Sequence, residues 1–267
     1  MPLRLVALSI LALISVSQGW AEAFPRGMPK EVDHRAKYAE LIYGLENQGM
    51  RPSCLIFAVV TCLEFQHYQK TGQQLQLSED YVLYHAYLDR NEDPFKAVQE
   101  LGARDAGFNF SEIYGTIRQH GICTYERMPT TVGASSADLV KPDAAALRDA
   151  RQRQKLHYKL LGNSEDPKAA MLAAMKALQE GQPVVMSAKW PASAGLSRAV
   201  LIDTQPPGPG HHAVALVGYQ NETGKLEDTV FIFRNSWGRH WGVNGFGFIS
   251  WSYLADNLDT FIAVSAP

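Results

Sequence analysis

The chain has 267 residues, of which 46% are hydrophobic and 19% charged, a composition that excludes a disordered, collagenous or coiled-coil protein. Lys and Arg number 25 against 27 Asp and Glu, so the formal net charge is -2. The chain therefore has no overall basic excess to neutralise a phosphate backbone, and a nucleic-acid partner is not expected.

The first 23 residues have the pattern of a secretory signal peptide. Arg4 supplies a positive charge, residues 5–16 are apolar apart from two serines, and small residues at 19–23 offer cleavage after Ala21 or Ala23. An uncleaved anchor is the alternative, but the apolar run is shorter than the roughly 20 residues of a spanning helix. We therefore expect an exported protein, periplasmic or secreted, without stable membrane association.

The three cysteines, Cys54, Cys62 and Cys123, are an odd number. Outside the cytoplasm a disulfide can persist, so one bridge would leave one free thiol. A free thiol in an exported protein is a liability unless it is buried or used in chemistry.

A predicted helix begins at Cys54. Pro52 and Ser53 precede an apolar-rich run that extends to Tyr68, Ser53 is a plausible N-cap, and Gly72 is a plausible end. The N–H groups and dipole at a helix N-terminus favour an anion and lower the pKa of a thiol there. Cys54 is thus a candidate nucleophile, and a small buried structural cysteine is the alternative.

Further elements follow in chain order. Helices are predicted over residues 79–89, 111–120, 143–161 and 167–180, and strands over 184–188, 213–219, 229–233 and 246–251. Residues 130–141 are expected to form a loop between two lobes, and residues 206–210 a loop leading to His212. The basic residues of 143–161 alternate with Asp143 and Asp149, so we expect a solvated helix face rather than a binding patch; they are Arg148, Arg151, Arg153 and Lys155.

Three sequence blocks occur in a characteristic order. Residues 47–54 read Asn-Gln-Gly-Met-Arg-Pro-Ser-Cys, residues 211–219 read His-His-Ala-Val-Ala-Leu-Val-Gly-Tyr, and residues 234–238 read Arg-Asn-Ser-Trp-Gly. Together they resemble the papain-like (C1-type) cysteine peptidases. Weaker similarities at residues 32–33, 77–79, 107–108 and 241–246 extend the resemblance over nearly the whole mature chain.

The resemblance assigns a role to each residue that acyl transfer needs. Cys54 would be a thiolate paired with a protonated His212, which then protonates the departing amine. Asn235 would orient the imidazole. Gln48 would donate a side-chain N–H, together with the backbone N–H of Cys54, to the developing oxyanion.

Three further residues are expected at the substrate by the same resemblance. Gly107 and Phe108 correspond to part of the glycine segment of the cleft, and Trp237 is expected both at the substrate and over the His212–Asn235 bond, which it would cover from water. His211 is an alternative base, but strand alternation puts it on the opposite face from His212, and the His-Ala-Val pattern selects His212. The adjacent histidines also suggest a metal, yet no His-Glu-x-x-His motif or paired-cysteine spacing accompanies them. No metal or other cofactor is expected.

The resemblance implies an α+β fold of two lobes with the active site in the cleft between them. Residues 24–135 would form a helical lobe carrying the nucleophile, and residues 136–267 an antiparallel, β-barrel-like lobe carrying the His and Asn. A monomer acting on a protein or peptide substrate is expected. Only about eight residues separate the cleavage site from Val32, too few for a folded inhibitory propeptide.

The sequence also departs from the family pattern. Arg51 stands where most members carry a disulfide cysteine, Leu55 replaces a Trp, and Ala106 replaces a cleft glycine. Cys62 and Cys123 are left as a possible replacement bridge. These changes motivate an alternative in which a catalytically silent relative binds peptides, while a transpeptidase or amidase with the same residues is a nearer alternative to hydrolysis.

Overall fold

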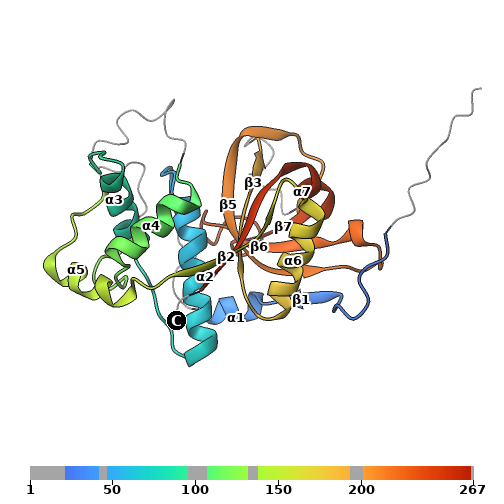
Figure 1. The fold of residues 1–267 in the computed structure, drawn as a ribbon, viewed down its shortest axis with the longest axis horizontal. Helices are drawn as coiled ribbons and strands as arrows, with labels where there is room; N and C mark the ends of the chain where they lie inside the picture. The colour runs from blue at the N-terminus through green and yellow to red at the C-terminus, as the bar shows by residue number, and fades with distance from the viewer. Residues whose placement is uncertain (1–21, 42–46, 96–106, 132–137, 193–200, 266–267) are drawn as a thin grey trace, which may run out of the picture.

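The computed structural model describes residues 22–41, 47–95, 107–131, 138–192 and 201–265, so residues 1–21 of the predicted leader, Ala106 and residues 132–137 of the predicted 130–141 loop lie outside the described residues. Figure 1 shows helices α2 to α5 on one side and the sheet with α6 and α7 on the other. In the described part of the chain, no helix combines the length and apolarity needed to cross a bilayer.

The helices largely follow the predicted start and stop signals. The side chains of Ser78, Asn109 and Asp166 each accept a backbone N–H at a helix start, and Gly72 ends the second helix with φ of 67°. The predicted starts at residues 54, 79 and 167 are confirmed. The helices are α1 (Arg35–Glu40), α2 (Cys54–Thr71), α3 (Glu79–Asp89), α4 (Phe110–His120), α5 (Ala144–Ala150), α6 (Pro167–Gln179) and α7 (Trp251–Asn257), with short 3-10 turns η2 (Arg151–Arg153) and η4 (Leu226–Asp228).

Most strands belong to one mixed sheet with the order β2-β8-β3-β5-β6-β7-β4, and β1 pairs beside β5. The pairs are antiparallel except β4 with β7. The combination of helices with a largely antiparallel sheet confirms the predicted α+β class. The described sheet keeps two edges and is therefore open rather than barrel-like. The strands are β1 (Glu31–Asp33), β2 (His157–Asn163), β3 (Val184–Pro191), β4 (Leu201–Ile202), β5 (Pro207–Gln220), β6 (Val230–Arg234), β7 (Phe246–Ser250) and β8 (Leu258–Ser265).

Two predicted segments are wrong. The helix expected over residues 143–161 ends at Ala150, and residues 157–163 instead form β2, which pairs with β8 along its length. The loop expected over 206–210 is already the start of β5, where Pro207 lies opposite Pro191 of β3. In both places long-range strand pairing overrides the local sequence preference.

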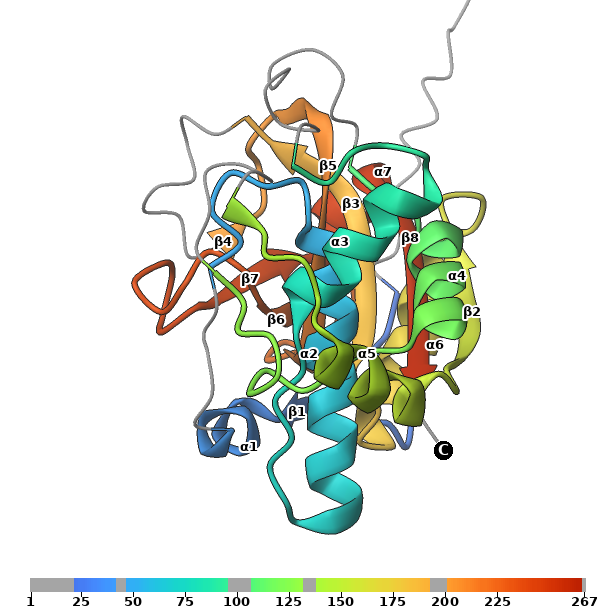
Figure 2. The ribbon, with the colours of Figure 1, turned by 90° about the vertical axis from the view of Figure 1, so that its left-hand side faces the viewer.

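The core lies on both faces of the sheet, as strand alternation requires. On β3, Val184 and Met186 pack with α6 in one cluster, whereas Val185 belongs to the cluster that contains α2. Figure 2 shows the upper part of α2 between the sheet and helices α3 and α5, with its lower end extending below them. Because α2 is covered on both sides, it is buried from Leu55 to Gln66 except at Thr61.

The predicted bridge between Cys62 and Cys123 is wrong. All three cysteines are free, and these two lie in different core clusters, Cys62 on α2 and Cys123 in the cluster that contains Tyr81. Burial raises the pKa of the Cys62 thiol well above its usual range and that of Cys123 to about 12. Both thiols therefore behave as protonated, small core side chains.

Gly218 sets how closely β1 approaches β5, and it gives a test of this pairing. A Cβ at Gly218 would lie 2.2 Å from the carbonyl oxygen of Val32, a distance that demands a backbone shift. We expect Gly218→Ala to lower the free energy of unfolding by about 1–3 kcal/mol in urea titrations. In α4, Gly115→Ala meets no atom within 4 Å and serves as the control, with an expected gain of about 0.5–1 kcal/mol. Equal stability of the two variants would contradict the close approach.

Candidate active site

A cleft of about 690 Å³ contains most of the predicted site residues. Gln48, Cys54, Gly107, Phe108 and His212 all line it. Asn235 is 3% exposed and lies behind His212, outside the lining. The structure thus brings together residues that are up to 187 positions apart in the sequence.

Cys54 is the first residue of α2 and is partly exposed in the cleft. Backbone N–H groups lie close to its sulfur, among them that of Ala213, the residue that follows His212. Burial raises the pKa of the Cys54 thiol, and the N–H groups of Ala213, Leu55 and Cys54 itself act in the opposite direction. Ser53 precedes the helix as predicted, but its hydroxyl makes no capping bond.

His212 is held by Asn235. The two side chains are joined by a 2.8 Å hydrogen bond between Nε2 and Oδ1, and the same Oδ1 accepts the backbone N–H of Ser236 at 2.8 Å. Because Oδ1 accepts from both groups, Nε2 carries the proton, which leaves Nδ1 of a neutral imidazole as the basic nitrogen. Burial lowers the pKa of His212 to about 4, and the bond to Asn235 opposes this shift.

His211 and His212 alternate along β5 as expected. His211 is exposed, whereas His212 is 7% exposed and bonded to Asn235. The structure thus separates the buried His212, which is bonded to Asn235, from the exposed His211, in line with the sequence pattern that selects His212. Within the described ranges, no group of three His, Cys, Asp or Glu side chains is placed to hold a metal ion.

Two indole rings enclose the imidazole. The ring of Trp237 lies 4.8 Å from that of His212, centroid to centroid, and Trp190 approaches edge-on at 4.7 Å. Trp237 thus packs against His212, while it is not part of the cleft lining. Trp190 was not singled out from the sequence; it continues the inward-facing alternation of Val184, Met186 and Ala188, but only the pairing of β3 with β5 brings it to His212.

Gln48 lies in a loop that is tied to the Asn235 loop. Its backbone N–H donates to the carbonyl oxygen of Ser236 at 2.9 Å, and its Oε1 accepts the Ser236 hydroxyl at 2.5 Å. Its Nε2 donates to the carbonyl oxygen of Arg51 at 2.8 Å, which engages one of the two amide hydrogens. The amide is therefore fixed at the cleft wall with a second N–H left for a ligand.

Arg51 forms a buried ion pair. Its Nη1 donates to Asp80 Oδ1 at 2.8 Å and to the carbonyl oxygen of Thr131 at 3.0 Å, and its Nη2 donates to Thr131 Oγ1 at 2.9 Å. Asp80 in turn accepts the N–H and hydroxyl of Thr131. The sequence singled out Arg51 only as a departure from a pattern, since nothing local identifies Asp80 and Thr131 as its partners.

A second arginine supports the other wall of the cleft. Arg90 Nη2 donates to the carbonyl oxygen of Gly107 at 2.7 Å, and its guanidinium lies 4.1 Å from the ring centre of Phe108. Glu112 accepts from Arg90 at 2.8 and 2.9 Å. Gly107 itself has φ of 70°, a conformation that favours glycine. Arg90 was missed because its partners come from a different helix and loop.

With this geometry in place, comparison with known proteins identifies the family. The family model described as papain family cysteine protease matches residues 28–254. The chain belongs to this family. Mouse (Mus musculus) procathepsin L is 26% identical over 231 residues, which cover 82% of this chain and 59% of that protein. A probable cysteine protease of Arabidopsis thaliana, RD19B, is 27% identical over 83% of this chain and 58% of that protein. The chain therefore spans less than two thirds of these relatives.

Solved structures show the same fold. Xylellain, a cysteine protease from Xylella fastidiosa, superposes with a TM-score of 0.67 at 18% identity, covering 93% of this chain and 91% of that one. The bromelain protease from Ananas comosus, solved with the E64 inhibitor, gives 0.61 at 19% identity over 90% of this chain and 100% of that one. The predicted papain-like fold is confirmed.

The buried ion pair of Arg51 gives a prediction about stability. We expect Arg51→Met to lower the free energy of unfolding by about 3–5 kcal/mol, because Asp80 is left as an uncompensated buried charge. The double variant Arg51→Met, Asp80→Leu should lose less than the two single variants together. Urea unfolding measures all three.

A partly exposed pair outside the predicted leader provides the matched control. Arg35 and Asp33 also form an ion pair, but their side chains are 32% and 24% exposed, so Arg35→Met should cost less than about 1 kcal/mol. A similarly small cost for Arg51→Met would contradict the structural role of Arg51.

The protonation of His212 can be tested by NMR titration of ring nitrogens. With the thiol removed in Cys54→Ala, burial alone should hold His212 neutral above about pH 4. Since this pKa lies below its ordinary 6.5, the unfolded chain takes up the proton first, and stability is lost as pH falls from about 6.5 to 4. In the wild type, a thiolate at Cys54 should raise the His212 pKa above that of Cys54→Ala. Identical titrations would exclude the predicted ion pair.

Proposed function

We propose that this protein is a cysteine peptidase that hydrolyses peptide bonds through a thioester on Cys54. The observation that carries the proposal is the 2.8 Å bond from His212 Nε2 to Asn235, with the Cys54 sulfur beside Ala213 in the same cleft. With Nε2 bonded to Asn235, Nδ1 is the ring nitrogen that remains to act on the proposed nucleophile. Membership of a protease family supports a protein or peptide substrate.

Each residue acts in turn. His212 takes the Cys54 proton, and the thiolate adds to the scissile carbonyl carbon to form a C–S bond. Gln48 and the backbone N–H of Cys54 donate to the resulting oxyanion. His212 then protonates the amine as the C–N bond breaks, and afterwards takes a proton from the water that hydrolyses the thioester. Asn235 keeps the ring oriented throughout.

The surroundings of the catalytic residues support this assignment. Trp190 and Trp237 cover the imidazole, and the buried His212–Asn235 bond is thereby shielded from competing water. Gly107 and Phe108, held by Arg90, form the wall along which we propose that the substrate backbone lies. We assign Trp237 to covering His212 rather than to contact with substrate.

The assignment of Gln48 is tested by turnover of a peptide amide. We expect Gln48→Ala to lower kcat about a hundredfold to a thousandfold, because one oxyanion donor is lost, while Cys54→Ala abolishes turnover. Gln119, an exposed glutamine at the end of α4, provides the matched control, and Gln119→Ala should leave kcat unchanged. Unchanged kcat for Gln48→Ala would refute the oxyanion role.

Labelling with an epoxysuccinyl peptide separates catalysis from silent binding. Modification confined to Cys54 and lost in His212→Ala would support the peptidase, whereas peptide binding with an inert Cys54 would favour a silent relative. Adding an acceptor amine separates hydrolysis from transfer, because a transpeptidase passes the acyl group to the amine. We also propose export through residues 1–23 and a monomeric protein of two lobes, of which the helical lobe includes α5 (Figure 1).

A further inference from the structure

An apolar strip on the protein surface continues the catalytic cleft beyond its lining residues. It consists of Phe110 and Tyr114 of α4 with Tyr158 and Leu160 of β2, and we call it the β2 strip. Of these four residues only Phe110 lines the cleft. Tyr158 is 49% and Leu160 53% exposed, while Phe110 and Tyr114 are half-buried. Large apolar side chains that are exposed next to one another indicate a binding surface, whereas isolated ones do not.

Leu160 extends a row of apolar residues that begins in the cleft. Val185 of β3 lies opposite Ile262 of β8, and Ile262 lies opposite Leu160 of β2. Residues opposite one another project from the same face of a sheet, so Leu160 shares the face on which Val185 and Ile262 line the cleft. Its neighbour Leu161 packs into the core cluster on the other face, as alternation requires. Because β2 is the last strand at this end of the described sheet, Leu160 is exposed where the two other residues of the row are buried.

Aromatic contacts join this row to α4. The ring of Tyr158 meets that of Phe110 edge-on at 5.1 Å and that of Tyr114 edge-on at 4.7 Å, centroid to centroid. The guanidinium of Arg118 lies 5.6 Å from the ring centre of Tyr114. Edge-to-face pairs stabilise the arrangement of the rings, so the strip is formed before any ligand binds.

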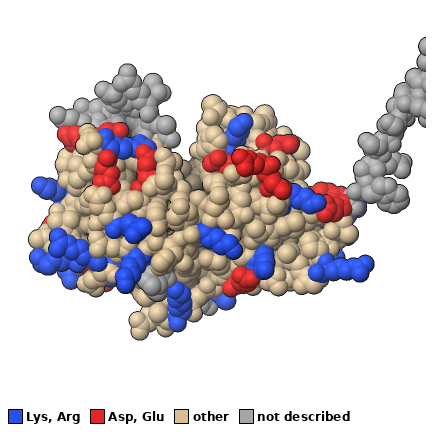
Figure 3. Space-filling model, in the orientation of Figure 1, with Lys and Arg blue, Asp and Glu red and all other residues tan. Residues whose placement is uncertain are grey.

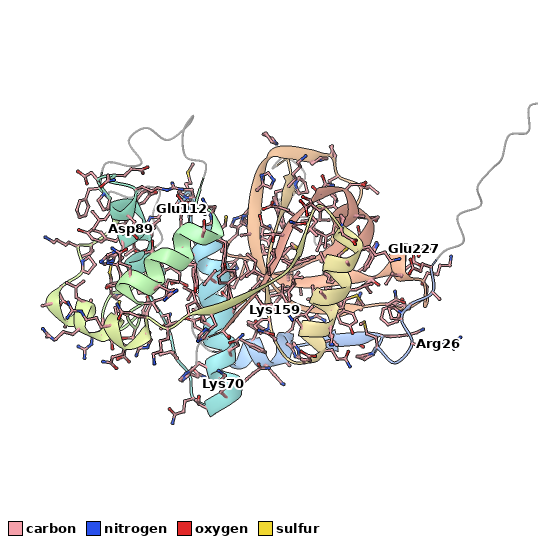
Figure 4. The ribbon with its side chains drawn as sticks, in the orientation of Figure 1. Arg26, Lys70, Asp89, Glu112, Lys159 and Glu227 are labelled. Atoms are coloured by element: carbon pink, nitrogen blue, oxygen red, sulfur yellow. The ribbon has the colours of Figure 1, made fainter. Side chains whose placement is uncertain are left out.

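The strip carries little charge. Figure 4 labels Glu112 on α4 and Lys159 on β2, and Figure 3, in the same orientation, shows mostly uncharged surface between the two. Glu112 accepts hydrogen bonds from Arg90 at 2.8 and 2.9 Å, which offset its negative charge. This surface therefore favours an apolar partner over an ionic one.

Continuity with the cleft decides what this surface would bind. Strands β5, β3, β8 and β2 are consecutive, so Ala213 of β5, beside the Cys54 sulfur, is about 14 Å from β2 at a strand spacing of about 4.8 Å. An extended chain covers this distance with about four residues. A peptide with its scissile bond at Cys54 thus reaches the strip with a side chain about four residues away.

We propose that the β2 strip binds a second, apolar or aromatic side chain of the same protein substrate, about four residues from the scissile bond. The inference rests on the proposed peptidase function, because that function places the scissile bond at Cys54. A folded protein buries most of its large apolar side chains, so the strip would favour extended, unfolded segments of a substrate. A very short peptide would bind in the cleft without reaching the strip.

The binding test uses the full chain as the Cys54→Ala variant, which keeps the peptide intact. The probes are ten-residue peptides of Ala and Ser with one Leu for the cleft at Val185 and one Trp three residues before or after it. Three residues of extended chain cover the two strand spacings from β3 to β2. In NMR titrations we expect replacement of Trp by Ser to weaken binding at least threefold in one of the two orders, with shifts at Tyr158 and Leu160. Equal binding with and without Trp, or shifts confined to the cleft, would overturn the proposal.

Two variants and one control assign the effect to the strip. Leu160→Ser and Tyr158→Ser should each remove the advantage of the Trp peptide over its Ser analogue. Leu201 of β4 is 42% exposed at the other end of the sheet and lies outside the cleft lining, so Leu201→Ser should keep that advantage. An advantage retained in both folded strip variants would refute the site. A wild-type dimer that Leu160→Ser dissociates in sedimentation would assign the strip to a second copy of the chain and overturn the proposal.

Cleavage by the wild type separates this proposal from the peptidase assignment. In a digest of an unfolded protein, mass spectrometry should show Leu, Phe, Tyr or Trp enriched about four residues from the cut on one side, and Leu160→Ser should lose this enrichment. Cuts without any such enrichment would overturn the role of the strip and leave the peptidase assignment intact. Trp-dependent binding without any cutting would support the strip and overturn the peptidase assignment.

Discussion

The burial of α2 between the helices and the sheet is the constraint on which the rest of the structure depends. Because both sides of this helix are covered, packing fixes its register against β3 and β5. Its first residue therefore has a fixed position beside Ala213 of β5. The hydrophobic core thus aligns the proposed nucleophile at a helix start with the proposed base on a strand.

The same burial opposes the charges that the chemistry requires. Removing water from Cys54 and His212 favours the thiol and the neutral imidazole, as the directions of both pKa shifts show. An ion pair can form only if the attraction between thiolate and imidazolium, with the N–H groups around the sulfur, exceeds this penalty. Asn235 can orient both the neutral imidazole and the imidazolium, since its uncharged Oδ1 accepts a hydrogen bond from Nε2–H without adding a charge of its own.

A residue of the site could be predicted from the sequence when its neighbours along the chain identify it, and not when its role depends on contacts with distant segments. Cys54, His212, Asn235 and Gln48 are each embedded in a local block of residues, and the cap residues of α3 and α6 are local too, so these could be located from the sequence. The partners of Arg51 and the position of Trp190 beside His212 depend on strand pairing and loop contacts far along the chain. Residues 157–163 show the same limit. They belong to a charged segment for which the sequence predicts a helix, but they form a strand because they pair with β8.

Arg51 shows how the loop before the nucleophile is held without a disulfide. A covalent bridge acts largely by restricting the unfolded chain, whereas the Arg51–Asp80–Thr131 network acts only in the folded state. Burial raises the pKa of Asp80, and Arg51 and Thr131 oppose that shift. The ion pair exists only while Asp80 is ionised, and the carbonyl of Arg51 also accepts from Gln48. The position of Gln48, the proposed oxyanion donor, is therefore linked to proton concentration, while a disulfide at this place would link it to redox conditions.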